Sequence, residues 1–392
     1  MADITLKTGQ QLAAFYREGG NFCEVYLDMS VDTADPPGVR DERRMSVLDT
    51  LRKSGAPQTD LDAVADALAT GIPGPSPVSL YVLVKDGAIR CQEVLSGRVV
   101  GPERVAYGPL PDVSPLLRTH VLDFAYLVVE TARDGGEARL FRAASPAVEA
   151  EEQVQGRTDT LHKVKRGGDW RNNHFQNHAM EIWKQTQSQL ASTIDEVVRQ
   201  HSPRFIVVAG DIRARQLLVE ELSPASRDLV AIEPTNTRAE GSKDDALLER
   251  LDAEIARVLA AGKEAILDKL NMHDGRGDKL GELNLGGVVR ALASAQVETL
   301  VLDSGKLQDH TLLAVDGEPW IAAAPEDTLG APVIATVSAQ LAMIRAALLT
   351  DAEVVFTDSF TSEEGEDSIT LPQHAAAAAV LRWASGPPVP GV

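Results

Sequence analysis

Residues 162–171 read HKVKRGGDWR, and residues 174–200 follow with HFQNHAMEIWKQTQSQLASTIDEVVRQ. Apolar side chains recur in the second stretch at helical spacing, which predicts a long amphipathic helix. The two adjacent glycines of the first stretch allow backbone angles that other residues avoid. The sequence therefore predicts a basic glycine tip followed by a long helix.

Strand patterns flank this helix on both sides. Residues 121–131 and 137–141 are apolar runs separated by the turn-forming residues 134–136 (DGG), which predicts a β-hairpin. After the helix, residues 205–209 (FIVVA) have the pattern of a buried strand, and Asp211 is placed to cap the helix that follows. This succession indicates an α/β layer, and we assign it to a middle domain over residues 118–240.

The residues before this region, 1–117, are expected to form an α+β domain, bounded by the prolines near its end. The expected elements are helices at 8–18, 41–51 and 60–68, a half-buried strand at 22–29, and a hairpin of 78–84 with 88–95 around Asp86-Gly87.

The residues after it, 241–392, are expected to form a third domain, an α/β sandwich. The expected elements are helices at 244–270, 287–295, 333–349 and 373–383, strands at 297–302 and 354–357, and a hairpin of 311–315 with 319–323.

Composition narrows the class of protein. With 392 residues, 44% of them hydrophobic and a net charge of −20, the chain has globular proportions and is not built to coat nucleic acid indiscriminately. It has no apolar run of the roughly 18 residues that cross a membrane, and its first residues lack a signal core. We expect a cytoplasmic monomer with Cys23 and Cys91 reduced, although these two could pair.

The cations of the glycine tip stand out in this acidic chain. Lys163, Lys165, Arg166 and Arg171 lie within nine positions of one another, around Gly167-Gly168. Cations on such a tip suit contact with an RNA backbone. A solvated loop that is basic by chance is the alternative.

A resemblance supports the first of these interpretations. The order of hairpin, basic Gly-Gly tip, long helix and apolar strand resembles the middle domain of archaeal and eukaryotic class-1 release factors. Residues 287–303 (GVVRALASAQVETLVLD), 351–358 (DAEVVFTD) and 371–383 (LPQHAAAAAVLRW) are similar to parts of the C-terminal domain of release factors and Pelota. Among bacterial members of this superfamily, the sequence looks most like Balon-like ribosome hibernation factors and their actinobacterial relatives.

The resemblance implies a three-domain, tRNA-shaped protein in the ribosomal A site. Domain 1–117 would approach the decoding centre, although it lacks the Asn-Ile-Lys-Ser motif of stop-codon readers. Domain 118–240 would approach the peptidyl-transferase region, and domain 241–392 would face the side where Balon-like proteins meet elongation factor Tu. The implied rRNA-binding residues are Lys163, Lys165, Arg166, Gly167, Gly168, Asp169, Trp170, Arg171 and His174.

The departure from the family pattern is at Asp169, where release factors have glutamine. An aspartate is anionic at neutral pH and would face RNA phosphates, which opposes the close approach that hydrolysis needs. We therefore expect a hibernation factor that is not an enzyme and needs no cofactor. Two alternatives stay open: a release or rescue factor that hydrolyses peptidyl-tRNA, and a non-ribosomal α/β protein that binds a small ligand.

Three other patterns have ordinary explanations. His174 and His178 have the i, i+4 spacing of metal ligands but lack the metalloprotease glutamate, so we expect no metal site. Residues 275–277 (GRG) lack the lysine order of a phosphate-binding loop. The acidic run 363–367 (EEGED) is expected to be a solvated loop or a patch that meets a basic protein.

Overall fold

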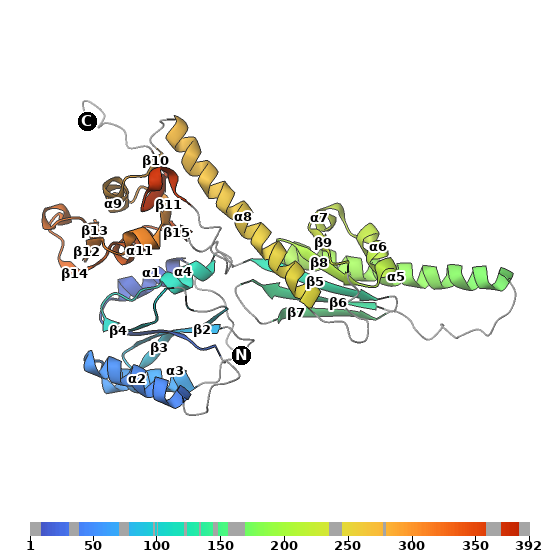
Figure 1. The fold of residues 1–392 in the computed structure, drawn as a ribbon, viewed down its shortest axis with the longest axis horizontal. Helices are drawn as coiled ribbons and strands as arrows, with labels where there is room; N and C mark the ends of the chain where they lie inside the picture. Colours follow the sequence, from blue (N-terminus) through green and yellow to red (C-terminus); the bar gives the residue numbers. More distant parts are fainter. Residues whose placement is uncertain are drawn as a thin grey trace. The chain divides into compact units, whose positions relative to one another are not determined.

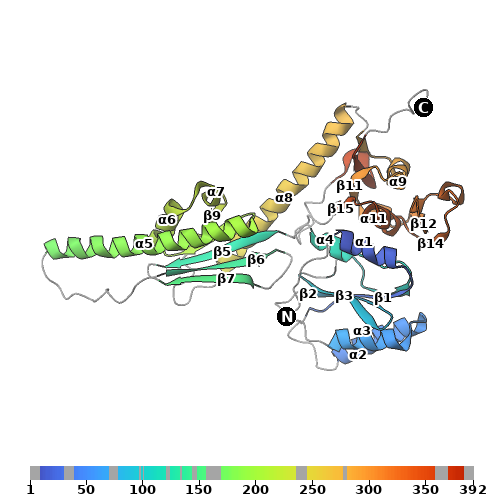
Figure 2. The same cartoon turned by 180° about the vertical axis from the view of Figure 1, so that it is seen from behind.

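The computed structural model describes twelve parts of the chain. These are residues 9–30, 39–69, 78–96, 99, 101–120, 124–132, 135–143, 148–155, 169–234, 245–276, 280–357 and 370–383. They form a mixed α/β structure with four sheets (Figures 1 and 2). The fold class predicted from the sequence is confirmed. None of the helices in these parts is both long and apolar enough to span a membrane.

The chain divides into two compact units, and the first is built from both ends of the sequence. Residues 1–122 and 259–392 make up unit 1, and residues 123–258 make up unit 2. The division into three domains stays a prediction beside this result.

The N-terminal part of unit 1 is a four-stranded sheet in the order β3-β2-β1-β4. Its elements are α1 (Gly9–Glu18), β1 (Phe22–Asp28), α2 (Val39–Lys53), α3 (Gln58–Ala69), β2 (Val78–Lys85), β3 (Ala88–Ser96), β4 (Arg104–Gly108) and α4 (Ser114–His120). The predicted hairpin is confirmed, with Asp86 and Gly87 both at positive φ. The expectation that the strand at 22–29 is half-buried is wrong, because separate apolar clusters cover the two faces of the sheet.

The C-terminal part of unit 1 contains two sheets, in the orders β10-β16-β11-β15 and β13-β12-β14. Its strands are β10 (Gly281–Glu282), β11 (Val297–Leu302), β12 (Thr311–Val315), β13 (Ile321–Ala322), β14 (Val333–Ser338), β15 (Glu353–Phe356) and β16 (Ala377–Leu381). Its helices are α9 (Leu285–Ala293), α10 (Ser304–Leu307), α11 (Ala339–Leu349) and the 3-10 turns η1 (Pro325–Thr328) and η3 (Pro372–His374).

Two helices predicted in this part are wrong. The first six of the 17 residues expected to be helical at 333–349 form β14, and the helix begins only after Ser338, whose hydroxyl accepts from the Leu341 N–H. The helix expected at 373–383 is replaced by β16, which pairs antiparallel with β11. All five residues of β16 are buried, so packing overrides the helix propensity of its alanines.

One apolar core joins the two ends of the chain. Leu12, Phe15 and Leu116 from the N-terminal part belong to the same buried cluster as Ile344 and Leu348 of α11. Arg118 of α4 adds a polar contact, because its guanidinium hydrogen-bonds to Ser304 Oγ at 2.6 Å and lies over the Phe356 ring. The two ends therefore fold onto each other as one unit.

Unit 2 contains a five-stranded sheet in the order β7-β6-β5-β8-β9. Its elements are β5 (Ala125–Ala132), β6 (Gly135–Arg142), β7 (Val148–Gln155), α5 (Asp169–His201), β8 (Ile206–Gly210), α6 (Ile212–Glu221), α7 (Pro224–Arg227) and β9 (Val230–Ile232). Helix α8 (Asp245–Arg276) continues from unit 2 into unit 1. Strands β5, β8 and β9 run parallel, and β6 and β7 run antiparallel to their neighbours, which makes this a mixed sheet.

Candidate functional site

The predicted RNA-binding residues fall on both sides of a helix start. Lys163, Lys165, Arg166, Gly167 and Gly168 lie outside the described residues. Asp169, Trp170, Arg171 and His174 lie in the first turns of α5, where the structure describes the backbone only. Helix α5 begins five residues before the expected start at 174, directly after the glycine pair.

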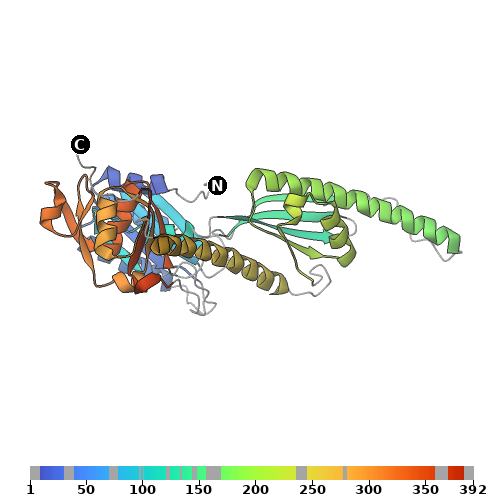
Figure 3. The same ribbon diagram turned by 90° about the horizontal axis from the view of Figure 1, so that it is seen from above.

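Much of α5 extends past the sheet that it covers. Gln187 hydrogen-bonds to Thr131 and Ala132 at the carboxyl end of β5, and after the helix the Arg204 N–H donates to the Ala125 carbonyl at the other end. The helix therefore runs antiparallel to β5, and residues 169–186 lie beyond the end of the sheet (Figures 1 and 3). At 1.5 Å per residue these 18 residues span about 27 Å. We call residues 169–186 the arm.

A buried polar pair fixes the base of the arm. The Thr131 hydroxyl donates to Gln187 Oε1 at 2.7 Å, and Gln187 Nε2 donates to the Ala132 carbonyl at 2.9 Å. Thr131 and Gln187 are both 0% exposed. Close packing adds to this, because a Cβ on Gly136 would lie 2.4 Å from Leu190 Cδ2. At Gly136 the helix therefore packs too closely on the sheet for any side chain larger than that of glycine.

The far half of α5 is tied to α7. The Asp195 carboxylate accepts hydrogen bonds from the Ser223 N–H, the Ser223 hydroxyl and the Ser226 hydroxyl. Gln187 and Asp195 therefore anchor α5 to its surroundings at two points, which are about 12 Å apart along the helix axis. Neither contact was predicted from the sequence, since each joins residues distant in the chain.

The turn after β8 confirms the predicted cap. The Asp211 side chain accepts from the backbone N–H groups of Arg213 and Ala214 at 3.0 and 3.1 Å. Gly210 has φ +109°, and a Cβ there would lie 2.0 Å from the Thr131 carbonyl oxygen. The glycine is therefore required for β8 to lie beside β5.

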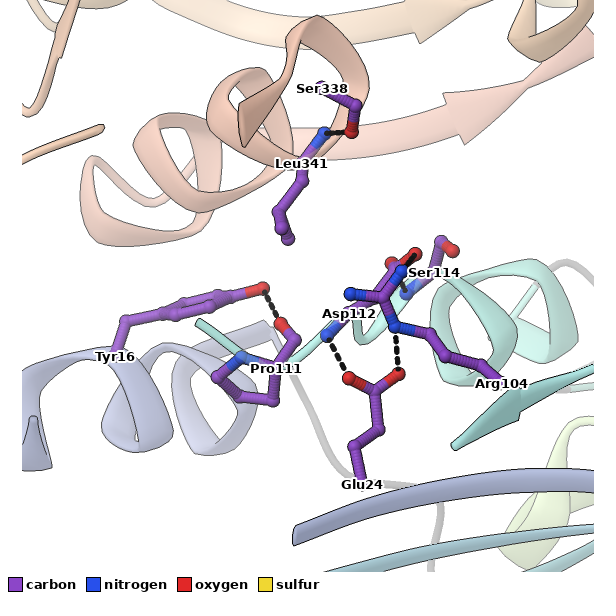
Figure 4. Close-up of polar contacts among 8 residues, drawn as sticks. All are labelled: Tyr16, Glu24, Arg104, Pro111, Asp112, Ser114, Ser338 and Leu341. Carbon is purple, nitrogen blue, oxygen red and sulfur yellow. Dashed lines mark hydrogen bonds and ion pairs between the residues drawn. The ribbon is translucent and has the colours of Figure 1, made fainter. Parts of the chain in front are cut away.

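A second polar cluster lies in unit 1 and was missed by sequence reasoning (Figure 4). The Glu24 carboxylate accepts from the Asp112 N–H at 3.0 Å and ion-pairs with Arg104 Nε at 2.9 Å. The Tyr16 hydroxyl donates to the Pro111 carbonyl at 2.9 Å. Burial raises the pKa of Glu24 to about 7, against the opposing effect of Arg104.

A cavity of about 160 Å³ lies beside Glu24 and Arg104, with apolar walls that include Phe22, Val337 and Leu341. Pockets for small organic ligands typically measure about 300–1,000 Å³.

The remaining sequence patterns fall largely outside the part of the chain whose side chains the structure describes. Among the described residues, no group of three His, Cys, Asp or Glu side chains is placed to hold a metal ion. His174 and His178 lie in α5, and Gly275 and Arg276 lie in the last turn of α8. The structure describes only the backbone of these four residues. Gly277 and the acidic run 363–367 lie outside the described residues. Cys23 and Cys91 are both buried free thiols.

Comparison with known proteins identifies a family model that matches part of the chain. Residues 125–276, from the first residue of β5 to the last of α8, match the family model "Bacterial archaeo-eukaryotic release factor family 2". This match confirms the resemblance to the bacterial branch of the archaeo-eukaryotic release factor superfamily. The release-factor-like segment contains the whole of α5 and the five-stranded sheet.

Relatives and solved structures cover more of the chain at lower similarity. The uncharacterised proteins Rv2629 and MT2704 of two Mycobacterium tuberculosis strains are each 23% identical over 345 residues, which is 87% of this chain and 90% of theirs. The archaeal translation termination factor aRF1 is 14% identical, covering 96% of this chain and 99% of that one, with a TM-score of 0.25.

Archaeal Pelota, in a model of ribosome-bound Pelota and ABCE1, is 14% identical and covers 97% of this chain and 94% of that one, with a TM-score of 0.38. At these TM-scores the whole-chain superpositions carry no argument about function.

Proposed function

We propose that this protein occupies the ribosomal A site as a hibernation factor and does not release the nascent peptide. The observation that carries the proposal is the arm, which starts at Asp169, directly after Gly167-Gly168, and projects about 27 Å past the sheet. A single helix is about 10–12 Å wide. It can enter a crevice walled by RNA that the body of the protein cannot, with Lys163, Lys165, Arg166 and Arg171 meeting phosphates at its end.

Asp169 supports binding without catalysis. A carboxylate in this position is repelled by RNA phosphates and lacks the neutral amide that release factors use. Its position at the start of α5 stabilises the helix through the dipole. We infer that Asp169 stabilises the start of the helix and opposes the close approach to peptidyl-tRNA that hydrolysis needs.

The rest of the proposal follows the family architecture. Domain 1–117 faces the decoding centre, domain 118–240 the peptidyl-transferase region, and domain 241–392 the factor-binding side, with elongation factor Tu as a further partner. The match to a family described as release factors favours one second candidate, a release or rescue factor.

Two assays on programmed ribosomes separate the candidates. Saturating protein should leave peptidyl-tRNA intact, with or without a stop codon, and should block A-site tRNA while sparing P-site tRNA. Stoichiometric peptide release would establish the second candidate instead. Simultaneous full occupancy by the protein and A-site tRNA would rule out the proposed location.

Shortening the arm tests the structural basis of the proposal. Deleting residues 172–182 removes about three turns, shortens the arm by about 16 Å and keeps its rotational phase within about 20°. Unit 2 should stay folded, because Gln187 and Leu190 remain. Competition with A-site tRNA should be lost, whereas a variant with the same 11 residues replaced by an alanine-rich helix of equal length should retain it.

Removing the cations tests RNA contact. Each phosphate contact adds about 0.7–0.9 to the slope of log affinity against log salt. Changing Lys163, Lys165, Arg166 and Arg171 together to Ala should flatten the slope for ribosome binding by roughly two to three units. Changing Glu363, Glu364 and Glu366 to Gln is the control and should leave the slope unchanged. An unchanged slope in the first variant would show that the tip does not touch RNA.

A further inference from the structure

Residues 311–338 of unit 1 have no role in the proposed contact between the arm and RNA. They comprise the sheet β13-β12-β14 and the turn η1, all within the described part of the chain, and we call them the acidic sheet. This stretch contains four carboxylates, Asp316, Glu318, Glu326 and Asp327, and no Lys, Arg or His. Such one-signed charge gives a surface a preference for cationic partners.

Two apolar side chains of the same stretch are also exposed to solvent. Leu329 is 83% exposed and Val333 is 46% exposed. Leu329 has φ +52°, in the left-handed region that is unfavourable for leucine. Because the side chain is mostly in solvent, its packing inside the fold does not account for leucine at this position.

The scaffold beneath Leu329 is ordered by specific contacts. Arg345 is 1% exposed, and its Nη1 donates to the carbonyls of Val315 and Trp320 at 3.0 and 2.9 Å, which fixes the turn between β12 and β13. The Thr328 hydroxyl donates to the Pro325 carbonyl at 2.9 Å, and the Ala331 N–H donates to the Thr328 carbonyl at 3.0 Å. These contacts order the backbone on both sides of Leu329 before any partner binds, which lowers the entropic cost of binding.

We propose that the acidic sheet docks on a basic protein of the ribosome, with Leu329 entering an apolar socket rimmed by Lys and Arg. This inference rests on the proposed ribosome binding and names the partner class for the C-terminal part. The alternatives fit the surface less well, because the carboxylates repel RNA phosphates and anionic lipid headgroups. A second copy of a chain with net charge −20 is disfavoured for the same reason.

The test uses the full chain and purified 70S ribosomes. A photoreactive benzoylphenylalanine is placed at position 329 in one variant and at position 248 in another, since Leu248 of α8 is also largely exposed, at 55%. After irradiation, position 329 should crosslink to a ribosomal protein with a basic surface, and position 248 should give no crosslink to that protein. A crosslink from position 329 to rRNA or to a second copy of the chain would overturn the assignment.

Affinity measurements provide the second readout. Leu329→Gln should weaken ribosome binding about tenfold, and Glu326→Lys with Asp327→Lys should weaken it at least as much, while Leu248→Gln should leave it unchanged. Unchanged thermal melts would verify that the exposed substitutions spare the fold. If wild-type protein binds and both acidic-sheet variants bind equally well, the docking surface is wrong and ribosome binding stands. If the wild-type protein fails to cosediment with ribosomes, the proposed function fails and this inference with it.

Discussion

Replacing Gln187 tests whether a buried polar pair holds the base of the arm. Its side chain makes two hydrogen bonds to the carboxyl end of β5, one with the Thr131 hydroxyl and one with the Ala132 carbonyl. We consider three variants: Gln187→Ala, Thr131→Val, and the double variant Thr131→Val with Gln187→Leu. The first removes both bonds, the second removes one, and the third makes the pair apolar at similar volume.

The expected costs follow from what each variant leaves unpaired. A hydrogen bond contributes about 1 kcal/mol net, and a buried polar group left without a partner costs about 1–3 kcal/mol. Gln187→Ala loses two bonds and strands the fully buried Thr131 hydroxyl, so unit 2 should lose about 3–5 kcal/mol. Thr131→Val should cost about 1–3 kcal/mol. The double variant should cost less than Gln187→Ala, because only the Ala132 carbonyl loses its donor.

Hydrogen exchange measured by mass spectrometry reports the loss of stability separately for each segment of the chain. A local measurement is needed because a chain with two compact units need not unfold in one step. Protection of the β5, β6 and β8 amides should fall most in Gln187→Ala, and peptides from β1 and β2 in unit 1 should be unchanged. A double variant as unstable as Gln187→Ala would refute the reasoning, since the double variant keeps the side-chain volume and strands no hydroxyl, so the stranded hydroxyl would not set the cost.

Three further predictions concern single positions. Gly210→Ala should destabilise unit 2 more than Gly136→Ala in urea unfolding, because the new Cβ would meet a backbone oxygen at 2.0 Å in one case and a leucine methyl at 2.4 Å in the other. Ser338→Ala should cost about 1 kcal/mol of unit 1 stability by the same measurement, through loss of the α11 cap. Glu24 has a folded pKa of about 7 against an ordinary value of 4.5, so the folded state holds its proton more tightly. The stability that this gives is complete below about pH 4.5 and is lost as the pH rises to 7, by roughly 3 kcal/mol. The Glu24→Gln variant should lack this pH dependence, so the difference in stability between wild type and variant should change by that amount across the same pH range.

The elements that the sequence predicts well are those whose local pattern and tertiary role agree. The hairpin at Asp86-Gly87 has turn residues suited to positive φ between two apolar runs, and the cap at Asp211 has a side chain that reaches the next N–H groups. For α5, the apolar spacing over residues 174–200 locates the body of the helix. The helix start was placed five residues late because the polar residues 169–173 carry no apolar spacing that would extend the pattern.

The wrong predictions are those where distant contacts decide. The residues of β16 are mostly alanine, which favours a helix in isolation, but the strand pairs with β10 and β11 and is buried throughout. The residues of β14 run directly into α11 without a glycine or proline, so periodicity alone merged the two. Strand β7 was missed because it lies at the edge of its sheet and carries three glutamates, a composition that resembles a loop.

The same limit applies to the candidate site. The sequence identified the basic tip because cations and glycines are visible along the chain, whereas the Thr131–Gln187 pair and the Glu24–Arg104 cluster join residues 56 and 80 positions apart. Nothing in the local sequence shows that Arg118 reaches Ser304, or that residues from both ends of the chain share a core.

Segregation of charge along the chain is what the proposed ribosome binding requires of so acidic a protein. Four cations gather in residues 163–171, while residues 311–338 hold four carboxylates and no cation. Because salt screens charges beyond roughly 10 Å, the arm tip responds to its own surroundings and not to the net charge of −20. Within unit 2, the arm places residue 169 about 27 Å from the end of the five-stranded sheet, which is about three Debye lengths. A ribosome offers both kinds of partner, phosphate for the tip and basic protein for the acidic sheet. Reversing the charge of either segment should therefore weaken binding, although the two reversals change the net charge in opposite directions.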